Sequence, residues 1–492
     1  MHRATWGLLL LSACACSGSP GASADASSAG SAAAMGEVSG GSAGSGSAGG
    51  GSGGGGSSGA IDDDPDPQLS ADDLSKLREL SPDQLPAPPS DPTNAWADDA
   101  AAAAFGQTLF FDARFSGELL DGDNDGTQFA LGQKGETGKV SCAGCHVPED
   151  GFSDTRTLGK QISLGAGWGI RRAPSLLDVG QSKLLMWDGR RDALFNQPFG
   201  VLESEVEMNS SRLYAAAQVF ENHKPAYEAI FGPLPPLDDQ TRFPRLSATD
   251  TGCPSLDRDN KCTAKKRGQP GDGAEFDALS ADDQDAITRV WVNVGKALGA
   301  YQRKLSCGSG AFDAWVHGDD SAIGRAEQRG AGLFVGKAGC AKCHSGPYLS
   351  DEDFHNVGLR PGLVAAVFTD LNDQGAAVGL PSAKADPLNS LGKFSDGHDS
   401  RLPDNVAPAD AGAFRTPRLR CVAERPSFMH TGHVRSLADV IDFFDRGGEQ
   451  GGFPGQNELL PLKLTARERA DLLAFLQTLK GSGPPAALLT AP

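Results

Sequence analysis

Two short motifs hold the residues with the most specific chemistry in this chain of 492 residues. Residues 142–146 read CAGCH and residues 340–344 read CAKCH, and the pattern Cys-x-x-Cys-His is the attachment site of c-type haem. Each pair of thiols can form thioethers to one edge of a porphyrin, while the adjacent histidine binds the iron. A zinc site or a redox-active cysteine pair uses similar residues, but two complete copies favour covalent haem. We therefore expect two haem c groups, bound by Cys142, Cys145, His146, Cys340, Cys343 and His344.

The elements around these motifs have helical patterns. Apolar residues recur at spacings of three and four between residues 287 and 301, Ser436 precedes a similar stripe, and Thr465 with Glu468 forms a capping box. No long alternating strand pattern occurs. The motifs begin 198 residues apart, at 142 and 340, which favours one haem per domain. The sequence predicts a mainly α fold with two c-type-cytochrome-like helical domains and long loops.

The composition divides the chain further. Between residues 17 and 60, 39 of 44 positions are Gly, Ser or Ala, which cannot pack a core and predicts a flexible tether. Leu234 to Gly273 is rich in turn residues and reads as an insertion or surface excursion, with folded structure beginning near Thr93. We expect a signal peptide at 1–13, a tether at 14–92, an N-terminal haem domain at 93–285 with the insertion at about 234–273, a C-terminal haem domain at 286–480 and a tail at 481–492.

The N-terminus resembles a bacterial lipoprotein signal. A basic start and a short apolar centre precede small residues and Cys14, which would be lipidated; ordinary secretion with cleavage after Cys16 is the alternative. Either way we expect a periplasmic or cell-envelope location, with membrane contact only through the N-terminal lipid. The formal net charge of −19 disfavours nonspecific binding to nucleic acid or to an anionic membrane surface.

The other cysteines allow two pairings. Cys253 and Cys262 lie close enough for a local disulfide, while Cys307 and Cys421 are either a long-range bridge or two buried thiols. Nearby, Asp121–Gly126 matches the start of a calcium loop, but its twelfth position is glycine rather than glutamate. A solvated polar turn is favoured there, and calcium is doubtful.

Several motifs in order resemble the bacterial di-haem cytochrome c peroxidases and their MauG-like relatives. The resemblance spans about residues 106–479. It rests on Leu109–Asp112, Met186–Arg190, Glu205–Asn209, Gly332–Phe334, Phe414–Pro417 and Phe428–Gly432.

This resemblance implies a role for several residues. The haem on His146 would be the peroxide site, with Glu207 as distal acid and base and Gln197 as the amide that positions the peroxide. Trp187 is similar to the tryptophan that helps electrons cross between the haems. The haem on His344 would receive electrons singly from a small cytochrome c or cupredoxin. The family also implies a possible homodimer.

Two departures from the family pattern concern axial ligands. Many relatives cap the resting peroxide haem with a histidine where this chain has Ala166, so we expect an open, high-spin first haem. At the second haem, Phe444 stands where the family has a methionine or tyrosine ligand. Met429, His430 and His433 are the nearby candidates for that ligand, and an empty position is the alternative.

A third departure concerns the calcium that the family holds between its domains. The positions aligned with its asparagine and threonine ligands carry Arg172 and Arg425, neither of which can bind a cation. We expect one guanidinium to occupy the place of the cation electrostatically; a solvated arginine is the alternative.

The activity expected from these residues is reduction of hydrogen peroxide to water by a di-haem c peroxidase. A MauG-like oxidase that modifies a protein partner is one alternative, and the phenylalanine at position 444 counts against it. A tethered electron carrier without catalysis is another, and Glu207 and Gln197 beside an uncapped haem count against that.

Overall fold

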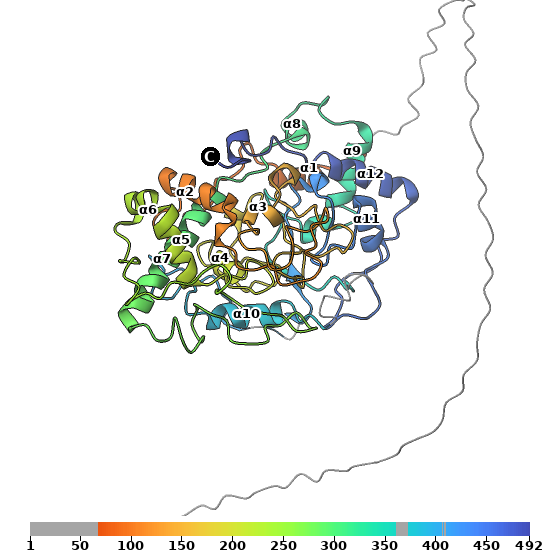
Figure 1. The fold of residues 1–492 in the computed structure, drawn as a ribbon. Coiled ribbons are helices and arrows are strands. Elements are labelled where there is room, and N and C mark those ends of the chain that lie inside the picture. The colour runs from red at the N-terminus through yellow and green to blue at the C-terminus, as the bar shows by residue number, and fades with distance from the viewer. Residues whose placement is uncertain (1–66, 361–371, 406, 408–409) are drawn as a thin grey trace, which may run out of the picture. The chain divides into compact units, whose positions relative to one another are not determined.

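The computed structural model describes residues 67–360, 372–405, 407 and 410–492, and it is mainly helical (Figure 1). The predicted signal peptide, Cys14 and most of the predicted tether lie outside the described residues. The α-helices are α1 (Ala71–Leu80), α2 (Ala100–Phe111), α3 (Cys142–Cys145), α4 (Gln197–Leu202), α5 (Arg212–Asn222), α6 (Lys224–Phe231), α7 (Ala281–Gln302), α8 (Ala311–Val316), α9 (Arg325–Val335), α10 (Ala376–Ala385), α11 (Leu437–Asp445) and α12 (Ala466–Gln477).

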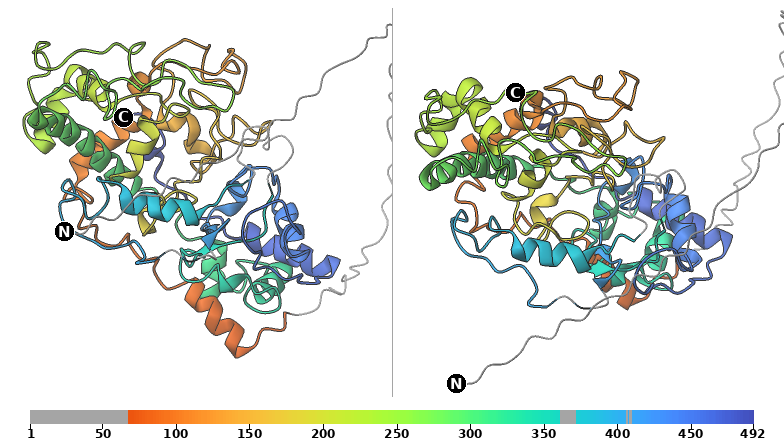
Figure 2. Two further views of the ribbon diagram at one scale, coloured as in Figure 1. Left: turned by 90° about the horizontal axis from the view of Figure 1, so that it is seen from below. Right: turned by 60° about the horizontal axis from the view of Figure 1, so that its bottom comes forward.

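Short 3-10 helices and one small sheet complete the secondary structure. The 3-10 helices are η1 (Ala113–Phe115), η2 (Pro148–Asp150), η3 (Val179–Gln181), η4 (Cys340–Lys342), η7 (Val422–Glu424) and η8 (Ala486–Leu488). Strands β1 (Phe354–His355) and β2 (Phe414–Arg415) pair antiparallel, with Phe354 opposite Arg415. The many helices and the single small sheet confirm the mainly α prediction, and long loops connect most elements (Figure 2). In the described parts of the chain, no helix combines the length and apolar composition that crossing a bilayer requires.

The largest hydrophobic cluster forms around α7, which packs side by side with α2 (Figure 1) and also contacts α4 and α5. Ser280 caps the helix by accepting a hydrogen bond from the backbone N–H of Asp283. A Cβ at Gly106 of α2 would overlap the carbonyl of Ala297, so the glycine permits the close approach. The predicted domain boundary at 285/286 falls within this continuous helix, whose apolar stripe packs as one face.

A second cluster forms around α9 and α12, which lie side by side, with α11 packed against α12. The capping box of Thr465 and Glu468 starts α12 as the sequence predicts. Gly330 of α9 approaches the backbone of Asp471 so closely that a Cβ would overlap it. The second haem motif lies beside this cluster, because Cys340 and Ala341 pack against it.

Helix α1 belongs to the second cluster, so the folded chain begins before the predicted start near Thr93. Ser70 and Asp73 form a capping box, and the side chains of Leu77 and Leu80 are buried in the second cluster. Ser81 ends this helix, and its Oγ donates to Asp313 at 2.7 Å. Residues 71–80 are therefore part of the folded core, because two leucines one turn apart dock on it.

The C-terminal tail also packs on the fold. The amide of Gln107 in α2 donates to the carbonyls of Ala487 and Thr490 at 2.7 and 2.8 Å. The hydroxyl of Tyr301 in α7 donates to the carbonyl of Leu488 at 2.6 Å. These bonds fix the tail against the two central helices of the first cluster.

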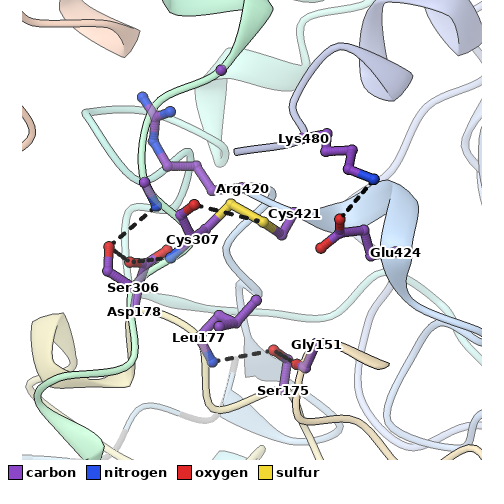
Figure 3. Close-up of a disulfide and its surroundings, with 12 residues drawn as sticks. Gly151, Ser175, Leu177, Asp178, Ser306, Cys307, Arg420, Cys421, Glu424 and Lys480 are labelled. Atoms are coloured by element: carbon purple, nitrogen blue, oxygen red, sulfur yellow. Dashed lines mark hydrogen bonds and ion pairs between the residues drawn. A yellow bond between two sulfur atoms is a disulfide. The ribbon is translucent and has the colours of Figure 1, made fainter. Parts of the chain in front are cut away.

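Two disulfides fix long loops. Cys253 and Cys262 are joined within the predicted insertion. Cys307, just after α7, is joined to Cys421 at the start of η7, 114 residues later (Figure 3). Both sulfurs of the second bridge are buried, so the sequence alternative of a long-range bridge is the one that the structure shows. The bridge links the end of the first cluster to the segment that leads into the second.

We expect Leu77→Ala to lower the free energy of unfolding of the haem-loaded protein by about 2–5 kcal/mol, because it leaves a cavity in the second cluster. Leu77 is 1% exposed, whereas Leu74 of the same helix is 38% exposed. Leu74→Ala is therefore the control and should change the free energy by less than about 0.5 kcal/mol. Denaturant titration measures both; equal, small effects would show that α1 does not contribute to the core.

Candidate active site

A cavity of about 580 Å³ lies next to the first Cys-x-x-Cys-His motif. This volume falls in the range of small-molecule and cofactor sites. Its wall is mostly apolar, with a few polar groups gathered from α3, α4 and the loops between them. The lining residues with chemistry are Cys142, Cys145, His146, Arg172, Met186, Trp187, Arg190, Gln197 and Glu207.

Both motif histidines present the nitrogen that an iron needs. Nδ1 of His146 lies 3.1 Å from the carbonyl oxygen of Phe152, and Nδ1 of His344 lies 2.9 Å from that of Leu349. A carbonyl only accepts, so Nδ1 carries the proton and the Nε2 lone pair is free to bind a metal. Burial lowers the pKa of both imidazoles and keeps them neutral.

The motif cysteines fit attachment of a porphyrin. Cys142, Cys145, Cys340 and Cys343 are free thiols, whereas the other four cysteines of the described chain form disulfides. Burial raises the pKa of Cys142 to about 12, that of Cys145 to about 11 and that of Cys340 to about 12. Two thiols and an imidazole beside a mostly apolar cavity of about 580 Å³ suit haem c, whereas a structural zinc site closes four ligands around the ion and leaves no such cavity. The residues present therefore fit the expected group.

Glu207 and Gln197 lie in the wall of the same cavity. Burial raises the pKa of Glu207, while the positive charges of Arg190 and Arg191 and a hydrogen bond with Ser204 oppose that rise. Gln197 is the first residue of α4, and its Nε2 donates to Sδ of Met186 at 3.5 Å. The structure thus brings together a carboxyl group of raised pKa and an amide donor beside His146.

A glycine loop positions Glu207. The backbone N–H of Ala166 donates to the carbonyl of Glu207 at 2.8 Å, and that of Gly167 donates to Val206 at 3.0 Å. A Cβ at Gly165 would stand 2.5 Å from the carbonyl oxygen of Glu207, so only glycine allows this approach. Ala166 itself is fully buried, and its methyl group cannot bind iron.

The turn at Asp121–Gly126 supports the glycine loop. Nδ2 of Asn124 donates to the carbonyl of Gly165 at 3.1 Å. Asp123 pairs with Lys160 and accepts from Nε1 of Trp168 at 2.8 Å. Among the described residues, a group of three metal-ligating side chains occurs at Cys343, Asp351 and His355, and none occurs in this turn.

The predicted insertion reaches the active site, so its description as a surface excursion is wrong in part. Asn260 lines the cavity, and its Nδ2 donates to the carbonyl of Trp168 at 3.0 Å. Leu256 lies against Gly167. Sequence reasoning missed Asn260, because no local pattern marks a loop that folds back on a distant cavity. It also gave no role to Met186 and Arg190, although both stand in a motif that carries the resemblance.

Trp187 lines the cavity, and its backbone bonds to strand β2 of the small sheet. Its Nε1 donates to the carbonyl of Arg172 at 2.7 Å. Its carbonyl accepts from the backbone N–H of Arg415 in β2 at 2.8 Å. The ring centroid of His430 is 6.3 Å from that of Trp187. β2 pairs with β1, which begins ten residues after His344.

The three candidates for the second distal ligand lie in one turn. His430 stacks on Phe414 with ring centroids 3.6 Å apart, and burial, with repulsion from Arg171, lowers its pKa to about 3. Nδ1 of His433 shares a hydrogen bond of 2.7 Å with Thr431. Met429 has a positive φ of 69°. The structure places His430 beside Trp187 and does not by itself select a ligand among the three.

Comparison with known proteins identifies the family. Residues 100–321 match the family described as di-haem cytochrome c peroxidase. Over 416 residues the chain is 30% identical to the methylamine utilization protein MauG of Methylorubrum extorquens, covering 84% of this chain and 86% of that protein. The chain belongs to the di-haem cytochrome c peroxidase and MauG family. This confirms the resemblance, and membership implies haem c as the cofactor.

Two further relatives of this chain have different descriptions. It is 28% identical to the cytochrome-c peroxidase IdrP1 of a Pseudomonas species, strain SCT, over 84% of this chain and 88% of that protein. A solved MauG-like protein associated with microbial copper homeostasis matches with a TM-score of 0.51 and 25% identity, covering 84% of this chain and 98% of that one. The family thus includes both peroxidases and MauG-like proteins.

We expect Gly165→Ala to slow the peroxide-induced change of the haem spectrum roughly 100-fold, because the added methyl displaces the backbone that carries Glu207. Gly159→Ala is the matched control, since a Cβ there meets no atom within 4 Å. Stopped-flow absorption measures both rates. A Gly165 variant as fast as the control would mean that the loop does not position Glu207.

Proposed function

We propose that the protein reduces hydrogen peroxide to water at its first haem, with electrons that arrive one at a time through its second haem. The donor would be a small cytochrome c or cupredoxin. The observation that carries this proposal is the presence of Glu207 and Gln197 in the cavity wall that also holds His146. An electron carrier has no use for a proton-transfer group beside its iron.

Haem bound to His146 would supply the iron that takes the peroxide and passes electrons to it. Glu207 accepts a proton from one peroxide oxygen and returns it to the other, which leaves as water. Two further protons and two electrons are then needed to release the first oxygen as a second water. A carboxyl group whose pKa is raised by burial can do both steps near neutral pH. Gln197 donates from its amide to orient the peroxide.

Electrons would cross through Trp187. Its indole is held by Arg172 on the cavity side, and its backbone is held by β2, whose partner strand follows the second motif. This double attachment supports a route between the two halves of the molecule. The absence of a histidine at Ala166 supports a first haem that is open and high-spin without prior reduction.

A MauG-like oxidation of a protein partner is the second candidate, favoured by the 30% identity to MauG. Phe444, on α11, lacks the oxygen of the tyrosine ligand that MauG chemistry uses, so peroxide reduction remains the first candidate.

We also infer that the protein acts in the periplasm or cell envelope, anchored through a lipid on Cys14. The layout of residues 1–13 and the two haem-attachment motifs support this inference. Homodimerisation is a further part of the proposal and rests on the family alone.

We expect Glu207→Gln to lower kcat/KM for oxidation of a reduced small cytochrome c by hydrogen peroxide by roughly 100- to 10,000-fold, because the amide cannot accept the proton. Glu149→Gln, at an exposed glutamate, is the control and should match the wild type. A Glu207 variant with full activity would contradict the proposal. No turnover in the wild type, while peroxide still produces a high-valent haem spectrum, would favour the MauG-like candidate.

The pH dependence tests the same carboxyl. Glu207 must be ionised to accept a proton, and its pKa is raised, so kcat/KM falls on the acid side at a pH above the ordinary glutamate pKa of about 4.3. Arg190 lowers the pKa of Glu207 more than Arg191 does. Arg190→Gln should therefore raise this pKa further and move the acid limb of the profile to higher pH. Arg258→Gln, at an exposed side chain, should leave it in place. An acid limb that Arg190→Gln does not move would exclude Glu207 as its source.

A further inference from the structure

Arg172, which is buried, and Arg425, which is partly buried, have charges without a carboxylate partner. Most buried guanidinium groups of the described chain form ion pairs, as Arg171 does with Asp373 and Arg420 with Asp313. Within the described residues Arg172 and Arg425 form no ion pair, and each has a buried nitrogen without an acceptor. Burial lowers the pKa of each to about 10, so both remain protonated at neutral pH. An unpaired buried charge is strongly destabilising unless a ligand neutralises it.

Each of these arginines also has a donor without a partner. Arg172 is 4% exposed; its Nη1 donates to the carbonyl of Gln161 at 2.7 Å, and its Nη2 is buried without an acceptor. Arg425 donates from Nη2 to the carbonyl of Arg420 at 3.2 Å, and its Nε is buried without an acceptor. Guanidinium donors bind carboxylates in fork geometry, so the unused atoms indicate an anionic partner.

Arg172 lies at the first haem site. It lines the cavity together with Cys145 and His146. Its carbonyl accepts from Nε1 of Trp187, and its backbone N–H donates to the carbonyl of His430 at 2.8 Å. The backbone is therefore fixed on both sides, and the guanidinium has little freedom to find another partner.

Arg425 lies at the second haem site. Its Nη2 donates to the carbonyl of Arg420 at 3.2 Å, and Nε of Arg420 donates to the carbonyl of Pro347, three residues after His344, at 2.6 Å. It follows η7, four residues after Cys421, whose disulfide to Cys307 fixes this segment (Figure 3).

The acidic groups near Arg425 have other partners. Glu424 pairs with Lys480 at 3.2 Å. Oδ1 of Asp178 accepts from the hydroxyl of Ser306 at 2.7 Å and from the backbone N–H of Cys307 at 3.2 Å, whereas its Oδ2 is buried without a hydrogen-bond partner. Asp178 attracts Arg425, but the two side chains form no ion pair within the described residues. The other charged neighbours of Arg425 include Arg415 and Arg418, which repel it.

We propose that Arg172 binds a propionate carboxylate of the haem on His146, and that Arg425 binds a propionate carboxylate of the haem on His344. This inference rests on the two haems of the proposed function. It goes beyond the expectation that one guanidinium replaces the calcium of relatives, because it gives each haem its own cation. The protein then needs no metal ion between its haems.

The test uses full-length protein whose two covalent haems are verified by pyridine haemochrome and denaturing-gel haem stain. Redox titration followed by absorption and EPR gives the midpoint potential of each haem in Arg172→Gln and Arg425→Gln. Loss of a positive charge stabilises the ferric state. We expect the first variant to lower mainly the potential of the first haem, and the second variant mainly that of the second haem. Treatment of the wild type with EDTA should change neither potential.

Arg303→Gln is the control, because Arg303 is also buried, at 8% exposed, but pairs with Asp98 at 2.9 Å; it should shift neither potential. Unchanged potentials in both test variants, or release of calcium with a shift by EDTA in the wild type, would overturn the proposal. If Arg172→Gln or Arg425→Gln loses haem, Arg172→Lys or Arg425→Lys takes its place. Resonance Raman should then show an altered propionate bending band, and an unaltered band would overturn the assignment. Absence of haem from the wild type would instead refute the proposed function.

Discussion

The hydrogen bond from each motif imidazole to a backbone carbonyl is the interaction on which the site depends. An imidazole binds iron only through an unprotonated nitrogen, and the carbonyls of Phe152 and Leu349 hold the proton on the opposite one. Both carbonyls belong to residues with positive φ, 56° and 51°. The chain therefore accepts an unfavourable backbone conformation at each site to orient the acceptor.

Burial acts on several ionisable groups around the first cavity, and its consequence depends on the sign of the charge. It raises the pKa of Glu207, which suits the proposed proton carrier, and lowers that of His146, which suits a neutral ligand. The same desolvation leaves the guanidinium of Arg172 charged but in need of an anion. One apolar cavity thus suits the three proposed roles of base, metal ligand and anion receptor, because the three side chains start from different ordinary pKa values.

Local signals predicted the helices well and their assembly poorly. The caps at Ser436 and Thr465 start helices where the sequence places them, because a cap is decided by neighbouring residues. The docking of α1, the course of α7 across a predicted boundary and the reach of Asn260 into the cavity depend on contacts between distant segments. The haem motifs could be read directly, since their chemistry needs five consecutive residues. The unpaired arginines could not, since charge pairing is a property of the folded chain.

The position of α1 has a practical consequence for handling the molecule. Leu69 contacts Gly332 of α9, and Leu77 and Leu80 follow it into the cluster beside the second haem motif. A shortened form for expression must therefore keep the chain from Leu69 onward, or it exposes an apolar groove that invites aggregation. A label or immobilising tag attached just before Leu69 would stand at the half proposed to receive electrons. Such a tag would hinder the binding of a redox protein more than the entry of peroxide. On an electrode, it would favour direct electron transfer to the second haem.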